Sequence, residues 1–249
     1  MTELTDDQIT VVVPTYNEKD NLPELVAQLL ALPLPSLRVL VVDDNSPDGT
    51  GELADKLAAE NPGRIEVLHR IAKDGLGRAY IAGMTQALGD GADIVIQMDA
   101  DLSHPSARIP AMVATLQNSG AGVVLGSRYT PGGQTAGDWP WRRKALSAWA
   151  NFYVNTILNL KVKDATAGFK AWKAATLKAI DLETIRSNGY SFQVEMNWRT
   201  VRAGYRIAEV PITFSERAEG VSKMSLKVQL ESARTPWRLR FSKPAKHVN

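Results

Sequence analysis

The sequence contains no cysteine among its 249 residues. A disulfide framework, a thiolate nucleophile and a zinc site built from thiolates are therefore excluded. The absence of thiols also fits a reducing compartment. The three histidines are scattered, and none has the spacing to another that a histidine metal site requires.

Long apolar segments are missing as well. The apolar runs are short, for example Val11-Val12-Val13, whereas a membrane-spanning helix needs ~18 or more apolar residues. The chain begins with MTELTDDQ, which is acidic and polar and lacks the basic and apolar pattern of a secretory signal. We therefore expect a cytoplasmic protein that does not itself cross a membrane.

The sequence also lacks a large net charge. Basic and acidic residues nearly balance, and the formal net charge is only +2. The residues from 217 to 249 are nevertheless clearly basic, and the preceding part of the chain is slightly acidic. A basic end indicates an anionic partner, either a membrane surface or a nucleic acid, or else a solvated end that aids solubility. No pattern typical of nucleic-acid recognition accompanies it, so we expect no nucleic-acid partner.

Short apolar segments alternate with segments of helical periodicity over the first half of the chain. Strands are predicted at 9–13, 39–42, 65–68, 94–98 and 122–125, and helices at 24–32, 50–59, 77–88 and 106–118. Strands that are apolar throughout and alternate with helices are typical of a parallel sheet that is covered on both faces. The sequence therefore predicts an α/β fold with a mainly parallel sheet.

After residue 128 the pattern changes to aromatic and basic residues. An apolar stripe at helical spacing, within about 140–160, predicts a helix that packs in the core, against another subunit or on a membrane. A second amphipathic helix is predicted from about Lys223 to Thr235. The pattern alone does not decide between these surroundings.

Polar side chains follow three of the predicted strands directly. They are Tyr16 with Glu18, Asp43 with Asp44, and Asp99 with Asp101. Ligands of parallel sheets bind beyond the carboxyl ends of the strands, so we expect these groups to converge. Carboxylates at such an end suit Mg²⁺ or Mn²⁺ shared with a diphosphate, although a short D-x-D alone could equally cap a helix or solvate a loop.

Other nucleotide chemistries find no support in the sequence. The glycines near Gly75 lack the G-x-G-x-x-G spacing of a dehydrogenase, and no Walker loop is present. His104, beside the D-x-D motif, is predicted to be either an ordinary loop residue or a neighbour of the metal ligands.

Several motifs in order resemble one enzyme family. They are VPTYNE from Val13, VVDDNSPDGT from Val41, MDADLSHP from Met98, GSR from Gly126, DATAGFK from Asp164 and EVPI from Glu209. Over about residues 9–230 the chain resembles the inverting family 2 glycosyltransferases of the GT-A fold, and among them the dolichyl- or polyprenyl-phosphate mannose synthases. The resemblance implies transfer of mannose from GDP-mannose to a polyprenyl (dolichyl) monophosphate with inversion.

The resemblance also implies roles for individual residues. The guanosine of the donor would be held by Pro14, Tyr16, Glu18, Asp43 and Asp44, and the donor site would include Lys73 and Gly75. A Mg²⁺ or Mn²⁺ ion on the diphosphate would be bound by Asp99, Asp101 and Ser103. The acceptor phosphate would be bound by Arg128, Arg143, Arg217 and Lys223. Catalysis would depend on Asp101, Arg128, Arg217 and Lys223.

The same resemblance divides the chain into a GT-A catalytic domain at 1–216 and a basic acceptor loop with an amphipathic helix and tail at 217–249. Many relatives carry transmembrane helices at the carboxyl end, which this sequence lacks. We therefore expect peripheral contact with the cytoplasmic face of a membrane, or a membrane-anchoring partner protein. The alternatives are a polyprenyl-phosphate glucosyltransferase using UDP-glucose and a noncatalytic subunit that binds a nucleotide sugar.

Overall fold

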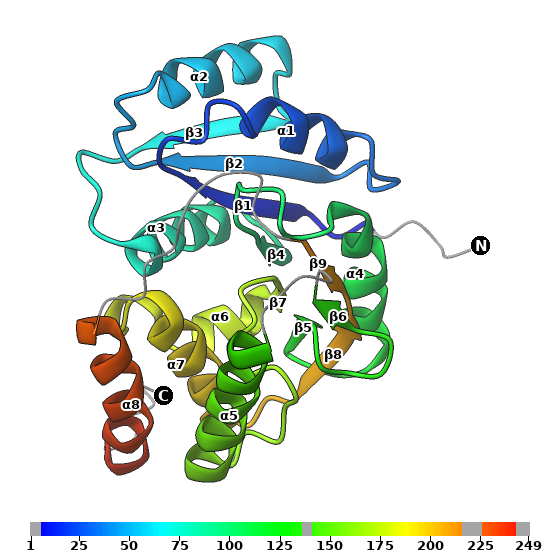
Figure 1. Cartoon of the computed structure of the whole chain (residues 1–249). Helices are drawn as coiled ribbons and strands as arrows, with labels where there is room; N and C mark the ends of the chain where they lie inside the picture. The colour runs from blue at the N-terminus through cyan, green and yellow to red at the C-terminus, as the bar shows by residue number, and fades with distance from the viewer. Residues whose placement is uncertain (1–5, 136–140, 216–225, 243–249) are drawn as a thin grey trace.

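A computed structural model describes residues 6–135, 141–215 and 226–242 (Figure 1). Its main sheet has seven strands in the order β3-β2-β1-β4-β7-β5-β8. These strands are β1 (Ile9–Thr15), β2 (Leu37–Asp43), β3 (Ile65–His69), β4 (Ile94–Gln97), β5 (Val123–Ser127), β7 (Lys170–Lys173) and β8 (Ile207–Pro211). Two short strands, β6 (Gln134–Thr135) and β9 (Thr213–Phe214), pair separately.

The predicted mainly parallel sheet is confirmed, with one exception. Strand β7 runs antiparallel to both of its neighbours, β4 and β5, while the other pairs in the sheet are parallel. Strand β7 was not predicted, because it has charged Lys170 and Lys173 at its two ends and no apolar run. Strand β7 therefore lies between the predicted strands β4 and β5, and β8 extends the sheet beyond β5.

Helices cover both faces of the main sheet, and alternate residues of β1 serve the two cores. Val11 and Val13 pack in one core with α1 (Leu22–Leu30), α2 (Thr50–Glu60) and α4 (Ile109–Asn118). Val12 packs in the other core with α3 (Leu76–Gly89), α5 (Trp141–Leu158), α6 (Ala174–Ala179) and α7 (Gly189–Arg202). In both cores apolar side chains are removed from water, and this removal is the main favourable contribution to the free energy of folding.

Two helices depart from their predicted bounds. Helix α1 begins at Leu22 instead of residue 24, because Pro23 fits the first turn, where its missing N–H costs nothing. The predicted helix at 106–118 begins as a 3₁₀ turn, η1 (Ser106–Arg108), before α4. A second 3₁₀ turn, η2 (Leu182–Thr184), follows α6.

The amphipathic helix near the carboxyl end is longer than predicted. Helix α8 (Leu226–Phe241) continues beyond Thr235 and through Pro236, because Thr235 and Leu239 are both buried against the body of the protein. The part of the prediction before residue 226 lies outside the described residues. The hydroxyl of Tyr153 on α5 donates a 2.8 Å hydrogen bond to the carbonyl of Ala233, so α8 is fastened to α5.

None of the helices in the described ranges combines the length and the apolarity that crossing a membrane requires.

Candidate active site

The polar groups predicted to converge lie at one edge of the main sheet, where β2, β1 and β4 are parallel neighbours. The chain leaves β1 toward β2 and β3 on one side and toward β4 on the other, so this edge is the point where the strand order reverses (Figure 1). Open α/β sheets bind ligands in the crevice at such a point. The predicted convergence of the three strand ends is confirmed.

Each of the three loops at this edge contains a residue with left-handed backbone geometry. The φ angles are 60° at Asn17, 57° at Asn45 and 60° at Leu102. Asparagine adopts this geometry readily, whereas a leucine there stores roughly 1–2 kcal/mol of strain. The strained Leu102 lies between Asp101 and Ser103, in the loop after β4.

Asp43, at the end of β2, is buried, and both of its carboxylate oxygens accept hydrogen bonds from nearby residues. It accepts hydrogen bonds from the hydroxyl of Thr15 at 3.1 Å, and from the backbone N–H and hydroxyl of Ser46 at 3.1 and 2.6 Å. Gly51 in α2 approaches it closely, since a Cβ there would lie 3.0 Å from Oδ2 of Asp43. Asp43 therefore fixes the shape of the loop after β2.

Asp44, the next residue, faces a cation that the sequence did not suggest. Arg70, directly after β3, forms an ion pair with Asp44. Burial raises the pKa of Asp44, and the charge of Arg70 opposes this rise only in part. The position of Arg70 beside the end of the neighbouring strand was the signal that could have revealed it, because β3 is parallel to β2.

The other residues that were predicted to bind the donor lie around the loop after β2. The Lys73 ammonium lies 3.7 Å from the centre of the Tyr16 ring, a cation–π contact between the loop before α3 and the loop after β1. The backbone N–H of Glu18 donates to the Thr50 hydroxyl at 3.0 Å, which ties it to the start of α2. Pro14 lies opposite Val42 in the β1–β2 register.

Gly75 stands immediately before α3, and its φ of 88° is one that other residues rarely adopt. A Cβ there would also lie 3.2 Å from the side-chain oxygen of Asn188, at the start of α7. The loop before α3 therefore needs a glycine both for its backbone and for its close approach to α7.

The two carboxylates of the D-x-D motif have different partners. Oδ1 of Asp99 accepts a 2.5 Å hydrogen bond from the hydroxyl of Tyr80 on α3. Oδ1 of Asp101 accepts from the backbone N–H of Ser103 at 3.1 Å and from its hydroxyl at 2.6 Å. The two aspartates thus share no partner in these bonds, and Ser103 orients Asp101.

His104 contacts this motif through the backbone of Asp99. Its Nδ1 accepts a 3.1 Å hydrogen bond from the backbone N–H of Asp99, and its ring stacks on Phe169 with centroids 5.2 Å apart. His104 is 4% exposed. Of its two predicted environments, the structure supports the one beside the D-x-D motif over an ordinary loop.

The chemistry of this strand end suits a divalent cation shared with a diphosphate. No three acidic, histidine or cysteine side chains of the described residues form a metal-binding group. Mg²⁺, however, is commonly held by one or two carboxylates together with substrate phosphates. A Cβ at Gly168 would lie 3.4 Å from the imidazole of His104 and 3.7 Å from Oδ2 of Asp99, so this oxygen lies on the side of Gly168.

Arg128, after β5, is bound to a buried carboxylate. Its Nε and one terminal nitrogen donate to the two oxygens of Asp164, each at 2.8 Å, and its backbone N–H donates to the same group at 3.1 Å. Burial disfavours the charged form, but the hydrogen bonds and charge of Asp164 outweigh this and raise the pKa of Arg128. Asp164 itself is fully buried.

The family model described as glycosyl transferase family 2 matches residues 10–181, the region that contains all of these strand ends. The chain belongs to glycosyl transferase family 2. The predicted family and fold class are confirmed.

Two curated relatives in the family align with most of the chain. A polyprenol monophosphomannose synthase of Mycolicibacterium smegmatis is 46% identical, over 86% of this chain and 80% of the relative. An undecaprenyl-phosphate mannosyltransferase of Micrococcus luteus is 49% identical, over 88% of each chain. The predicted likeness to polyprenyl-phosphate mannose synthases is therefore confirmed as a likeness.

Solved structures share the fold at much lower identity. Glucosyl-3-phosphoglycerate synthase of Mycobacterium tuberculosis, in complex with Mn²⁺, UDP and phosphoglyceric acid, has a TM-score of 0.70 at 18% identity, with 96% of this chain and 81% of that chain covered. The same enzyme with Mg²⁺ and UDP has a TM-score of 0.66, also at 18% identity, over 94% of this chain and 79% of that chain. These neighbours show the GT-A fold alone.

Three residues predicted for this family 2 site are not placed with the others. Arg217 and Lys223 lie outside the described residues, and so does the side chain of Arg143 on α5. Their assignment to the acceptor phosphate stays a prediction.

Besides Arg70, sequence reasoning missed several side chains that contact the candidate site residues. Phe214 at the end of β9 lies against both His104 and Arg128, with its ring 5.7 Å from the imidazole and 5.5 Å from the guanidinium carbon. Neither its neighbours in the sequence nor its periodicity gave a signal, because β9 has only two residues.

A buried lysine beneath the site was also missed. Nζ of Lys170 donates to the side-chain oxygen of Asn197 at 2.9 Å, and Asn197 donates to the carbonyl of Ala165 at 2.9 Å. Burial lowers the pKa of Lys170 well below its usual value, against the opposing charge of Asp164. Lys170 therefore supports the segment that carries Asp164.

Proposed function

We propose that the chain transfers mannose from GDP-mannose to a polyprenyl (dolichyl) monophosphate with inversion. The observation that carries the proposal is the D-x-D motif after β4, where Asp99 is half-buried and Asp101 is buried, at the same edge of the sheet as the ends of β1 and β2. The names of the two relatives at 46% and 49% identity support mannose and a polyprenyl phosphate. They favour this reaction over the alternative of UDP-glucose.

The donor would lie across the ends of β1 and β2. Tyr16, with Lys73 over its ring, offers a flat cationic surface beside the carboxylates of Asp43 and Asp44. Asp43 would act mainly by holding the loop, because its oxygens are occupied by Thr15 and Ser46. Glu18, Pro14 and Gly75 would complete the donor site by shaping the loops around it.

Asp99 and Asp101 would hold Mg²⁺ or Mn²⁺, which on binding neutralises charge on the departing diphosphate. Ser103 would act chiefly through Asp101, since its hydroxyl is 2.6 Å from that carboxylate. The residue is 1% exposed, which limits its direct access to a ligand. The two aspartates would thus be the main protein ligands.

The acceptor phosphate needs no general base. The second pKa of a phosphate monoester is ~6, so the group is largely dianionic at neutral pH and its oxygen can attack the anomeric carbon directly. One displacement forms the new carbon–oxygen bond as the bond to GDP breaks, which inverts the configuration. Arg128, Arg143, Arg217 and Lys223 would gather the acceptor phosphate, and Asp164 would hold Arg128 in position.

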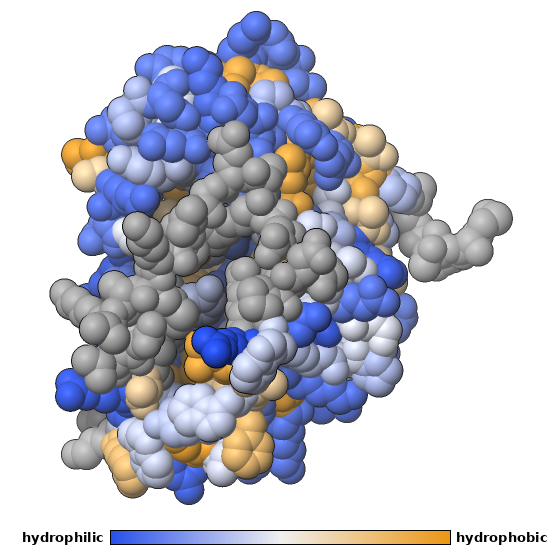
Figure 2. All heavy atoms as spheres, viewed as in Figure 1, coloured by the Kyte–Doolittle hydropathy of each residue, from blue (hydrophilic) through white to orange (hydrophobic). Residues whose placement is uncertain are grey.

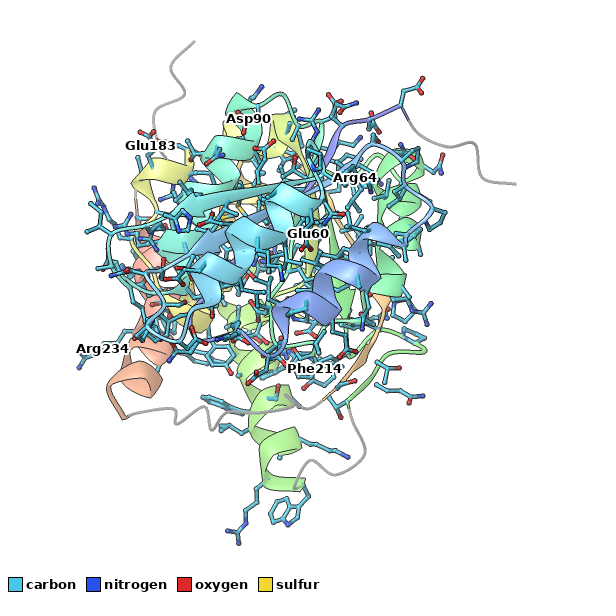
Figure 3. The ribbon with its side chains drawn as sticks, turned by 90° about the horizontal axis from the view of Figure 1, so that it is seen from above. Glu60, Arg64, Asp90, Glu183, Phe214 and Arg234 are labelled. Atoms are coloured by element: carbon cyan, nitrogen blue, oxygen red, sulfur yellow. The ribbon has the colours of Figure 1, made fainter. Side chains whose placement is uncertain are left out.

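The acceptor is a lipid, so the site must lie near a membrane surface. Helix α5 projects from the body (Figure 3). In addition to Trp141, it exposes the large apolar side chains of Leu146, Trp149 and Phe152. Apolar and weakly polar side chains gather over this end of the molecule in Figure 2. We propose that the exposed side of α5 and the end of α8 lie on the cytoplasmic face of a membrane, directly or beside an anchoring protein.

The stripe predicted within 140–160 is divided between core and surface. Ile157 and Leu160 are buried, whereas Trp149 is 57% and Phe152 is 70% exposed. The first part of α5 therefore contributes an open apolar surface and its last turn belongs to the core. This division is what a helix that contacts both the body and a lipid surface requires.

The reaction is tested by incubating the protein with GDP-mannose, Mg²⁺ and a short polyprenyl phosphate, followed by mass analysis of the lipid. The expected product is the polyprenyl phosphate with one added hexose in β linkage. UDP-glucose in a parallel reaction should give little product. Glucose transfer in preference to mannose, or no transfer to lipid with either donor, would refute the proposal.

Membrane contact through α5 gives a separate prediction. Replacing both Trp149 and Phe152 with serine should weaken binding to anionic phospholipid vesicles by about 100-fold or more, because each side chain loses ~1.5–3 kcal/mol of apolar burial. Sedimentation with vesicles measures the effect, and the melting temperature should stay unchanged.

The matched control for this double substitution is Ile71→Ser, which removes another exposed apolar side chain, in the loop between β3 and α3. It should bind vesicles as the parent protein does. A large fall in melting temperature of the double variant, without a change in vesicle binding, would assign Trp149 and Phe152 to packing instead.

A further inference from the structure

Tyr80 is a buried tyrosine held at both ends of its side chain. It lies on α3, is fully buried, and its hydroxyl donates the 2.5 Å hydrogen bond to Oδ1 of Asp99. Its ring stacks on Phe192 of α7, with the two planes 2° apart and the centroids 6.1 Å apart. The hydroxyl therefore cannot turn away from Asp99 without disturbing the packing between α3 and α7.

Asp99 is fixed at more than one atom. Tyr80 engages Oδ1, and His104 accepts the backbone N–H at 3.1 Å. The second oxygen, Oδ2, lies on the side of Gly168, where a Cβ would come within 3.7 Å. A carboxylate oxygen that accepts a short hydrogen bond has less charge to offer a cation, so Oδ2 is the better ligand of the two.

Mg²⁺ and Ca²⁺ make different demands on a carboxylate. Mg²⁺ requires a nearly octahedral set of oxygens at ~2.0–2.1 Å and dehydrates reluctantly. Ca²⁺ takes ~6–8 oxygens at ~2.3–2.6 Å and often binds a carboxylate through both atoms. A carboxylate with one oxygen engaged by the protein therefore suits the smaller ion.

We propose that Tyr80 is a positioning residue that restricts Asp99 to ligation through Oδ2 and thereby favours Mg²⁺ or Mn²⁺ over Ca²⁺. The inference rests on the proposed function, in which Asp99 binds the cation of the donor diphosphate. Tyr80 lies on the helix that begins directly after Gly75, so it also fixes Asp99 relative to the loop before α3.

The test compares the parent protein with Tyr80→Phe, which removes only the hydroxyl. The affinity for GDP is measured by calorimetry in saturating Mg²⁺ and, separately, in saturating Ca²⁺. In Mg²⁺ the affinity of the variant should fall about 10-fold, at the lower end of the effect of losing a hydrogen-bond partner of a metal ligand. In Ca²⁺ it should stay level or rise, so the Mg²⁺/Ca²⁺ preference should fall about 10-fold.

Thr176→Val is the matched control, because it deletes another buried hydroxyl, one that has no partner in the structure and lies on α6. It should leave both GDP affinities unchanged. An equal fall in both metals for Tyr80→Phe, or no change in either, would overturn the inference. Phe192→Leu offers a second route if Tyr80→Phe is poorly folded, since loosening the stacked ring should lower the same preference to a smaller extent.

The parent protein separates the two levels of the proposal. Metal-dependent GDP binding by the parent, with an unaltered preference in Tyr80→Phe, would refute the role of Tyr80 alone. GDP binding that needs no divalent cation in the parent would refute the metal assignment as well.

Discussion

Replacing Asp101 with asparagine is expected to lower mannosyl transfer by about 100- to 1,000-fold, the range seen when one preorganised electrostatic contact to the transition state is removed. The substitution removes a negative charge from the end of β4 but keeps an oxygen that can accept the hydrogen bonds from Ser103. The loop should therefore retain its shape while its affinity for a divalent cation falls. Steady-state transfer at several Mg²⁺ concentrations measures the effect.

Asp93→Asn is the control for this experiment. Asp93 stands just before the other end of β4, is exposed, and accepts a 2.9 Å hydrogen bond from the backbone N–H of Gln8. The same chemical change there should leave transfer and its Mg²⁺ dependence unaltered. Near-normal turnover of Asp101→Asn at low Mg²⁺ would contradict the assignment of Asp101 to the metal.

The first half of the fold was predictable because its local signals agree. The apolar runs of β1 and β2 are buried on both faces, and each is followed by a polar loop at the same edge of the sheet. A parallel sheet places all such ends together, so the predicted convergence of Asp99 and Asp101 with Asp43 and Asp44 at one edge followed from the parallel arrangement alone. The convergence needed no knowledge of the side-chain packing.

The side chains that contact the site residues could not be predicted from the sequence, for a different reason. Tyr80 and Asp164 act through contacts with residues 19 and 36 positions away in the chain. Helical spacing on α3 makes Tyr80 an ordinary core residue, and only the packing of α3 against β4 brings its hydroxyl to Asp99. Pairings of this kind depend on tertiary geometry, which neither periodicity nor motif spacing contains.

The ion pair of Arg128 and Asp164 leads to the second large effect. The Arg128 side chain is 11% exposed and that of Asp164 is fully buried, so both charges lie largely out of water. Removing one partner leaves the other buried and uncompensated, a loss of about 3–5 kcal/mol in many proteins. Asp164→Leu should accordingly lower the free energy of unfolding by about that amount, as measured by chemical denaturation.

A double substitution separates the structural from the catalytic role of Arg128. Arg128→Met combined with Asp164→Leu replaces the pair by apolar side chains, which often restores the stability lost by either single change. If Arg128 binds the acceptor phosphate, the double variant should regain most of its unfolding free energy while transfer stays at least about 100-fold below the parent, because the charge facing the phosphate is still missing. Recovery of transfer together with stability would show that the pair serves the fold alone, and Thr115→Val on the surface of α4 provides the control for the denaturation assay.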